Sequence, residues 1–178
     1  MSKNKGREIK IEDLEALVQG FDEDIAENLR SFIYNYKHEI AEKEQEEKKA
    51  FGHFRKLNIP KEALDSEVRE SPHCYQLKFG KDGYSDEDEW YMDWHSEIDV
   101  DWGATTLLDV LKSIEKESGC KIVKFGYTNG YDGYYADKNN KISFGKISGE
   151  CDLDECCDDF NLQLSNGNYY HLFFCEAK

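Results

Sequence analysis

The stretch from residue 86 to residue 102 holds the densest set of groups that could do chemistry. It reads DEDEWYMDWHSEIDVDW and contains eight carboxylates, all three tryptophans of the chain and no Lys or Arg. Carboxylates in such number could bind a hard cation, act as general acids or bases, or present negative charge to a basic protein. The eight are Asp86, Glu87, Asp88, Glu89, Asp93, Glu97, Asp99 and Asp101.

Apolar and acidic residues alternate through most of this stretch. At the even positions from 90 to 102 all residues but one are apolar, and at the odd positions from 89 to 101 five of seven are acids. Side chains alternate between the two faces of a strand, whereas a helix would turn Met92 and Val100 away from the tryptophans. The pattern predicts a strand with the three tryptophans in the core and a row of carboxylates facing solvent.

Two interpretations of this acidic row remain open. Carboxylates on one strand face stand about 6.8 Å apart, which is comparable to the spacing of phosphates along a nucleic acid. Adjacent exposed carboxylates also repel one another, a local conflict of the kind that often marks function. The row either binds a basic protein by imitating a nucleic-acid backbone or is simply the acidic solvent face of a half-buried strand. Because carboxylates along one strand face diverge, a metal site is disfavoured.

A second set of reactive side chains consists of cysteines and one histidine. Four such ligands in a tetrahedral arrangement would bind zinc. No C-x2-C pair occurs, two of the cysteines are adjacent, and the chain has no H-E-x-x-H, G-x-S-x-G or Walker motif. A metal-binding module or enzyme centred on residues 151–175 is therefore an alternative only, and no catalytic residue or cofactor is predicted. The candidate ligands are Cys151, Cys156, Cys157, His171 and Cys175.

The predicted loop from 126 to 140, GYTNGYDGYYADKNN, contains three glycines and four tyrosines. Tyrosine provides a rigid contact area with a polar tip, as in antibody paratopes. Tyr131 and Tyr134 are therefore candidate partner-binding residues. The alternative is a hairpin loop whose tyrosines pack on the edge of a sheet.

Helical periodicity dominates the first sixty residues. Residues 11–20 indicate a short helix, and apolar residues recur at helical spacing between 25 and 40. We predict an N-terminal helical region, 1–60, in which residues 22–57 form either one long helix or two helices that break near Gly52. This helix either joins two copies in a homodimer or is a solvated surface helix.

Strand patterns replace the helical ones after Pro60. This order predicts an α+β fold with N-terminal helices, one of them long, followed by a mainly antiparallel sheet with one packed helix and a C-terminal β-hairpin. We therefore divide the chain into the helical region 1–60 and an acidic α+β domain, 61–178. The predicted elements of this domain are strands at 73–80, 89–102, 120–128 and 141–147, a helix at 106–119 and a hairpin around Asn166-Gly167.

Negative charge is concentrated in the second part of the chain. The 178 residues include 38 acids and 23 bases, a net charge of −15, of which −2 falls in residues 1–60 and −13 in residues 61–178. Such a domain repels nucleic acid and anionic membranes and attracts cations or basic proteins. No apolar run approaches the roughly 20 residues of a membrane span, and we expect no signal peptide. A cytoplasmic protein with reduced thiols is therefore expected.

These observations favour a small acidic protein, without enzymatic activity, that binds a basic partner protein. The partner would be a nuclease or another nucleic-acid-binding enzyme, inhibited because carboxylates occupy the lysines and arginines that normally hold phosphates. Phage anti-defence inhibitors share this composition, as do toxin-immunity proteins, and the analogy extends to class only. The expected contacts are the eight carboxylates named above, together with Tyr131 and Tyr134.

Overall fold

The computed structural model describes residues 11–78, 91–101, 103–128, 142–154 and 157–175. The chain divides into two compact units, Met1–Lys49 and Ala50–Lys178, which we call the N-terminal and C-terminal units. The division lies inside a helix, whereas the sequence suggested one after Pro60. Phe54 explains the difference, because it is fully buried in the core of the C-terminal unit and ties the end of that helix to it.

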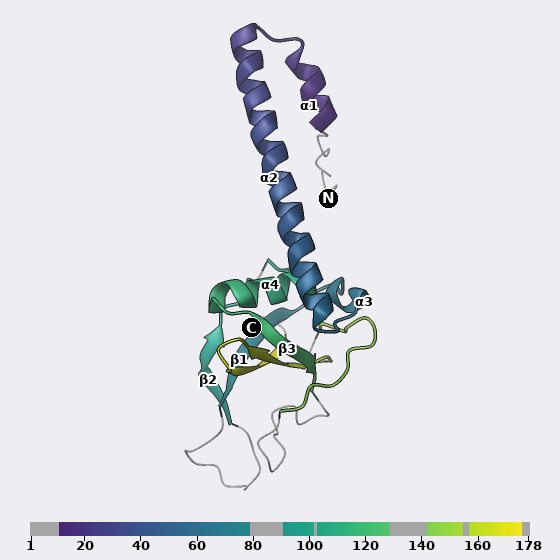
Figure 1. The fold of residues 1–178 in the computed structure, drawn as a ribbon, viewed down its shortest axis with the longest axis vertical. Helices are drawn as coiled ribbons and strands as arrows, with labels where there is room; N and C mark the ends of the chain where they lie inside the picture. The colour runs from purple at the N-terminus through teal and green to yellow at the C-terminus, as the bar shows by residue number, and fades with distance from the viewer. Residues whose placement is uncertain (1–10, 79–90, 102, 129–141, 155–156, 176–178) are drawn as a thin grey trace, which may run out of the picture. The chain divides into compact units, whose positions relative to one another are not determined.

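The N-terminal unit contains helix α1 (Ile11–Val18) and most of helix α2 (Glu23–Lys56) (Figure 1). Glu23 and Asp24 occupy the first turn of α2, where negative side chains interact favourably with the helix dipole. The helix continues through Gly52 without a break, so residues 23–56 form one helix rather than two. No helix in the described part of the chain is long and apolar enough to cross a membrane.

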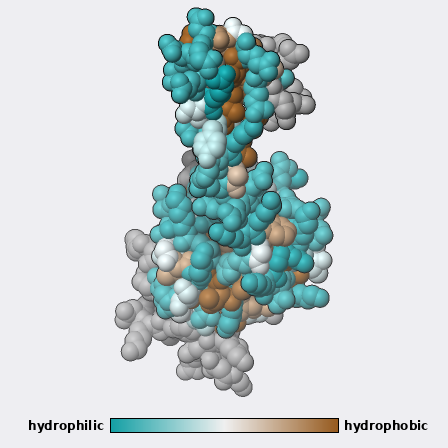
Figure 2. Space-filling model, turned by 45° about the horizontal axis from the view of Figure 1, so that its top comes forward, coloured by the Kyte–Doolittle hydropathy of each residue, from teal (hydrophilic) through white to brown (hydrophobic). Residues whose placement is uncertain are grey.

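A small apolar core holds α1 and α2 together. Val18 of α1 is buried with Ala26 and Ile33 of α2, and these two positions, seven apart, lie on one face of the helix. Several other large apolar side chains of this unit remain at the surface, and Figure 2 shows hydrophobic surface along it.

The C-terminal unit is built on a five-stranded antiparallel sheet with strand order β2-β1-β5-β4-β3. Helix α4 (Leu107–Ser118) covers one face of this sheet, and the short helix α3 (Lys61–Leu64) precedes the first strand (Figure 1). This arrangement confirms the predicted α+β fold, including the packed helix and the C-terminal hairpin. The strands are β1 (Ser71–Lys78), β2 (Tyr91–Ile98), β3 (Ile122–Tyr127), β4 (Phe160–Leu164) and β5 (Tyr169–Cys175).

Local sequence signals explain where α4 and the hairpin begin and end. Thr106 caps α4, because its hydroxyl oxygen accepts a hydrogen bond from the Asp109 N–H at 3.2 Å. Gly119 ends the helix with a φ of 64°, and Gly167 has a φ of 91° in the turn between β4 and β5. Both values favour glycine, which has no Cβ to clash there.

The core of the C-terminal unit lies between α4 and the sheet. Full burial of a large apolar side chain contributes roughly 1.5–3 kcal/mol, so this layer supplies much of the stability that holds the unit's surface groups in place. The largest of its fully buried side chains include Phe54, Leu107, Leu111, Ile114, Phe160 and Phe174.

The strand predicted at 141–147 is wrong for residues 142–147, which the structure describes. This segment forms one isolated bridge, in which the backbone groups of Gly145 and Tyr127 exchange hydrogen bonds of 2.6 and 3.1 Å. The approach is close: a Cβ on Gly126 would lie 2.4 Å from the Gly145 carbonyl oxygen. Ile147 is then buried in the core, so the segment crosses the edge of the sheet once instead of extending it.

Candidate functional site

The acidic stretch contains strand β2, which confirms a strand for residues 91–98. Asp93 and Glu97 lie within β2, and Asp99 and Asp101 follow its end. Whether any of these carboxylates contacts a partner stays a prediction. The remaining candidate contacts lie outside the described residues: Asp86, Glu87, Asp88, Glu89, Tyr131 and Tyr134.

The pairing of β2 with β1 is interrupted in the middle of the strand. Tyr75 pairs with Glu97, but the next residue of β1, Gln76, pairs with Asp93. Residues 94–96 therefore stand opposite no residue of β1, as in an extended bulge. The strand β2 therefore has two registers against β1 rather than one. From Glu97 to Asp101 burial alternates as predicted, with Ile98 and Val100 buried and the three acids exposed. The alternation before Glu97 stays a prediction.

Asp101 takes part in the turn that leads to α4. Its Oδ1 accepts a hydrogen bond from the Gly103 N–H at 2.9 Å, and its own N–H donates to Ser113 Oγ at 2.8 Å. Asp99 and Asp101 are both exposed. Asp101 therefore has a structural role that the sequence pattern did not indicate.

Glu97 lies against aromatic side chains of β1. Its Oε1 is 3.0 Å from His73 Nδ1, while 41% of its side chain remains exposed. Burial, reinforced by the Glu97 carboxylate, raises the pKa of the Tyr75 hydroxyl. Glu97 therefore combines access to solvent with defined neighbours.

Aromatic rings from β1 and β5 stack on the sheet face that carries Glu97. The ring of Phe173 lies 5.5 Å from that of His73, 5.7 Å from that of Tyr75 and 5.6 Å from that of His171, measured between centroids. His171 is buried, and the other three rings are partly exposed. A carboxylate beside stacked aromatic rings is an environment suited to an arginine guanidinium. The guanidinium can form an ion pair with the carboxylate and stack on the rings.

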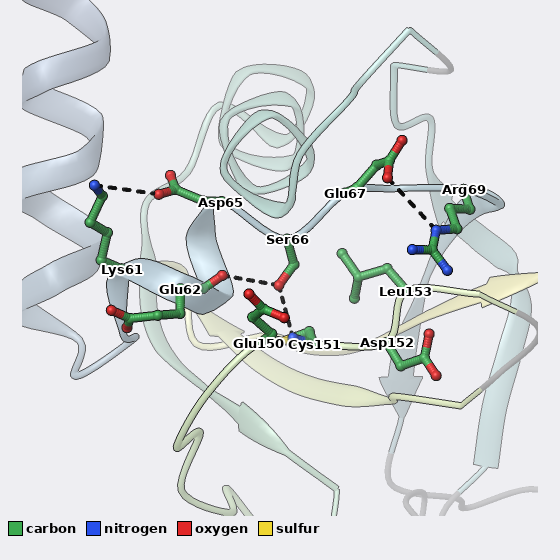
Figure 3. A pocket seen from close by; sticks show the side chains of 10 residues that line it. All are labelled: Lys61, Glu62, Asp65, Ser66, Glu67, Arg69, Glu150, Cys151, Asp152 and Leu153. Atoms are coloured by element: carbon green, nitrogen blue, oxygen red, sulfur yellow. Dashed lines mark hydrogen bonds and ion pairs between the residues drawn. The ribbon is translucent and has the colours of Figure 1, made fainter.

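A pocket of about 440 Å³ lies between α3, the segment that follows it and residues 150–153 (Figure 3). Its lining has five carboxylates and only two cations, so its formal charge is negative. We call it the acidic pocket. Its lining residues are Lys61, Glu62, Asp65, Ser66, Glu67, Arg69, Glu150, Cys151, Asp152 and Leu153.

Ser66 joins the two walls of the acidic pocket. Its buried hydroxyl donates to the Glu62 carbonyl oxygen at 3.1 Å and accepts from the Cys151 N–H at 2.8 Å. The Arg69 N–H donates to the Leu153 carbonyl at 3.3 Å, which holds the two segments side by side. Bonds that involve the backbone therefore fix the shape of the pocket.

The two cations of the acidic pocket already face carboxylates. Lys61 Nζ is 3.8 Å from Asp65 Oδ2, and the Arg69 guanidinium lies within 3.8 Å of two carboxylates. By contrast, the exposed side chains of Glu62 and Glu150 form no hydrogen bond or ion pair with any residue that the structure describes. These two carboxylates are available to a cation from outside.

A group of potential metal ligands lies next to the acidic pocket. One ligand atom each from Asp152, Asp154 and Cys157 lies within 4.8 Å of the other two. A hydrogen bond with Asp154 is the main reason why the pKa of the Cys157 thiol is raised to about 11. The thiol must lose its proton to bind a metal, so metal binding at this group would release a proton and weaken as the pH falls.

The cysteines and histidine considered for zinc point to different partners. Cys151 Sγ accepts a hydrogen bond from the Tyr127 hydroxyl at 3.5 Å, and His171 Nδ1 is 3.2 Å from Asn161 Oδ1. Cys156 lies outside the described residues. Among the four candidates that are described, no three bring their ligand atoms within 4.8 Å of one another.

Three of the described thiols are also poorly suited to nucleophilic chemistry. Burial raises the pKa of Cys151 to about 11, and burial raises that of Cys74 further still. The thiolate is the reactive form, and the raised pKa values keep Cys74, Cys151 and Cys157 protonated at neutral pH.

Sequence reasoning missed the acidic pocket. Its walls come from EALDSEVRE (62–70) and SGECDLDECCDD (148–159), which the sequence presents only as connectors. Their shared acidity was a usable signal, but Ser66 and Cys151 are 85 positions apart. Only the fold shows that they meet, through a parallel bridge between Val68 and Leu153.

The chain was also compared with known proteins. No protein-family model, no curated protein and no solved structure matches it. Its function must therefore be inferred from the residues and the geometry described above.

Proposed function

We propose that the C-terminal unit binds a basic protein and that the acidic pocket receives one of its lysine or arginine side chains. The observation that carries this proposal is the pair of carboxylates, Glu62 and Glu150, which have no partner among the described residues and line a pocket with five acids and two cations. A volume of about 440 Å³ equals roughly 15 water molecules at ~30 Å³ each, more than one arginine side chain requires.

The partly enclosed shape of the pocket strengthens the expected ion pairs. Two opposite unit charges at 4 Å attract each other by about 1 kcal/mol in bulk water and by about 4 kcal/mol near a protein surface with an effective dielectric constant of ~20. An incoming cation that meets both Glu62 and Glu150 is therefore held more firmly than at an isolated surface carboxylate. Glu97 and the aromatic rings beside it offer a second contact for an arginine.

The proposed action is inhibition or neutralisation of the partner by occupancy. The concentration of negative charge in residues 61–178 favours rapid, salt-sensitive association with a positively charged surface. A nuclease or another nucleic-acid-handling enzyme presents such a surface where it holds phosphates. The protein would then act as phage anti-defence inhibitors or toxin-immunity proteins do, by covering that surface in place of nucleic acid.

A metal-binding module is the second candidate function. The grouping of Asp152, Asp154 and Cys157 favours it. Metal analysis of the purified protein tests it: stoichiometric zinc that is lost in Cys157→Ser would support a metal module, and zinc below one atom per ten chains would exclude one.

The binding proposal is tested by capturing the partner from cells that naturally contain this protein. The bait variants are the unaltered chain and the double reversal Glu62→Lys with Glu150→Lys. We expect the unaltered chain to retain a basic protein, identified by mass spectrometry, and the double reversal to lose it because two lysines repel the incoming cation.

A matched control separates the pocket from the overall charge. Asp13→Lys with Glu27→Lys changes the net charge by the same four units at exposed positions of the N-terminal unit. This control should retain the basic protein. Equal loss in both variants would mean that net charge alone governs binding, and equal retention would remove the pocket from the interface.

A further inference from the structure

Helix α2 carries an exposed stripe of large apolar side chains. Ile25, Phe32 and Tyr36 are 48%, 60% and 43% exposed, and their spacing of seven and four residues places them on one helix face. Leu29 lies between them and is partly exposed. The rings of Phe32 and Tyr36 stack at 6.2 Å with an interplanar angle of 3°. We call Ile25, Leu29, Phe32 and Tyr36 the apolar stripe.

The contact between α1 and α2 leaves most of this stripe uncovered. That contact buries Ala26 and Ile33, which lie on the adjoining side of α2, with Val18 of α1. The 4-3-4 spacing of the stripe is the spacing by which one helix packs against another. The stripe therefore has the form of a helix–helix seam that is open in the single chain.

The exposed area is large enough for a stable dimer. Leu17 and Phe21, at the end of α1 and in the turn before α2, are 57% and 48% exposed. Together with the stripe they offer roughly 500 Å² of apolar side chain per copy, since a large side chain covers about 150–250 Å². An interface of standard size buries about 800 Å² per partner, of which about 60%, or roughly 480 Å², is apolar. The exposed apolar area of one copy is therefore close to what one such interface needs.

One cation beyond the stripe, Lys43, would face acidic residues when two copies are antiparallel; within its own helix it pairs with Glu39 at 2.8 Å. Lys43 lies eighteen residues, or five full turns, after Ile25 and therefore on the same face of α2. It follows Phe32 by eleven residues, and Asp22 precedes Phe32 by ten. An antiparallel copy centred on Phe32 would bring each Lys43 opposite the acidic turn of its partner, which begins at Asp22 and includes Asp24.

We propose that two copies of this chain associate through the apolar stripe, with their α2 helices antiparallel and related by a two-fold axis near Phe32. In such a dimer the Lys43 of each copy lies opposite the acidic turn of the other, because a two-fold axis repeats the same contact twice. Antiparallel helix dipoles add to this complementarity. This association does not depend on the proposed binding of a basic protein.

The association is tested by sedimentation of the full chain up to about 100 μM, a range that detects dimers with dissociation constants in the micromolar range. We expect a species of twice the chain mass. Ile25→Gln with Phe32→Gln should weaken the dimer by at least about tenfold, because the seam loses its apolar contact. Since both positions are exposed, circular dichroism should show an unchanged helix content.

Tyr34→Gln is the matched control. Tyr34 is 68% exposed, and its position on α2 is about half a turn away from the stripe. It should leave the dimer unchanged. A monomer at every concentration, or equal weakening by the control, would overturn the proposal.

The antiparallel orientation has its own test through exchange of charges. Lys43→Glu should weaken the dimer, and Lys43→Glu combined with Asp24→Lys should recover part of the loss in a double-mutant cycle. Lys43→Glu also removes the ion pair of Lys43 with Glu39 within α2. Lys48→Glu is therefore the control, because it removes the corresponding pair with Glu44 on another side of α2. If the double variant lost as much dimer affinity as the two single variants lose together, this orientation would be excluded.

Discussion

Removal of the Ser66 hydroxyl should open the acidic pocket without changing any of its charges. Ser66 is 7% exposed, and its Oγ joins the Glu62 carbonyl to the Cys151 N–H. In Ser66→Ala both backbone groups lose this partner. The variant therefore separates the shape of the pocket from its charge.

The expected loss of stability follows from these two bonds. A buried hydrogen-bonding group left without a partner lowers the free energy of unfolding by about 1–3 kcal/mol. The Cys151 N–H is the group most affected, since Cys151 is buried whereas Glu62 is exposed. We therefore expect Ser66→Ala to lower the free energy of unfolding by about 2 kcal/mol.

Urea unfolding measures this change, with Ser148→Ala as the matched control. Ser148 is exposed and only three residues from Cys151, so the same chemical change there should alter stability by less than about 0.5 kcal/mol. Ser66→Thr retains a hydroxyl and should recover part of the loss. If Ser66→Ala were no more destabilising than Ser148→Ala, the bonds that we assign to Ser66 would not hold the pocket.

Three other variants probe the fold and the acidic stretch. The Glu115 side chain is 9% exposed; its carboxylate accepts a hydrogen bond from the N–H of the buried Ile122 at 2.9 Å and contacts His53 and Lys121. Glu115→Ala leaves that N–H without its partner, so it should lower the unfolding free energy measured in urea by about 1–3 kcal/mol, against less than about 1 kcal/mol for the exposed Glu117→Ala. The folded state raises the pKa of Cys151 from about 9 to about 11. The contribution of this thiol to the free energy of unfolding is therefore complete below pH 9 and is lost as the pH rises to about 11. Chemical unfolding across this range should show that loss, and Cys151→Ala should reduce it; an unchanged slope would contradict the assignment. The third variant combines Asp93→Lys, Glu97→Lys and Asp99→Lys. It should keep the circular dichroism spectrum of the native chain and abolish capture of the basic partner. Unchanged affinity for that partner would remove β2 from the interface.

The sequence predicts those elements whose signals are local. Thr106 and Gly119 mark both ends of α4, and Gly167 marks the hairpin turn, because capping and positive φ depend on neighbouring residues only. The long helix α2 was likewise predictable from its periodicity. Whether it would pass through Gly52 was not, because glycine weakens a helix by only about 1 kcal/mol and the contacts of Phe54 decide the outcome.

The features that sequence reasoning missed depend on contacts between distant segments. The alternation in residues 89–102 predicts a strand, but the bulge at 94–96 is set by the register with β1, which no local pattern encodes. The acidic pocket arises only where the segment around Ser66 meets the segment around Cys151. The carboxylates that the sequence emphasised and those that line the pocket are thus different residues of the same acidic unit.

Calorimetric titration with an arginine-rich peptide shows whether the acidic pocket receives a cationic side chain. We expect binding to the unaltered chain that weakens as salt rises from about 0.1 M to 1 M, because the screening length falls from about 10 Å to 3 Å. Glu62→Lys with Glu150→Lys should weaken it at least about tenfold more than Asp13→Lys with Glu27→Lys. Equal affinities for the two double variants would contradict the claim that the acidic pocket receives a cationic side chain.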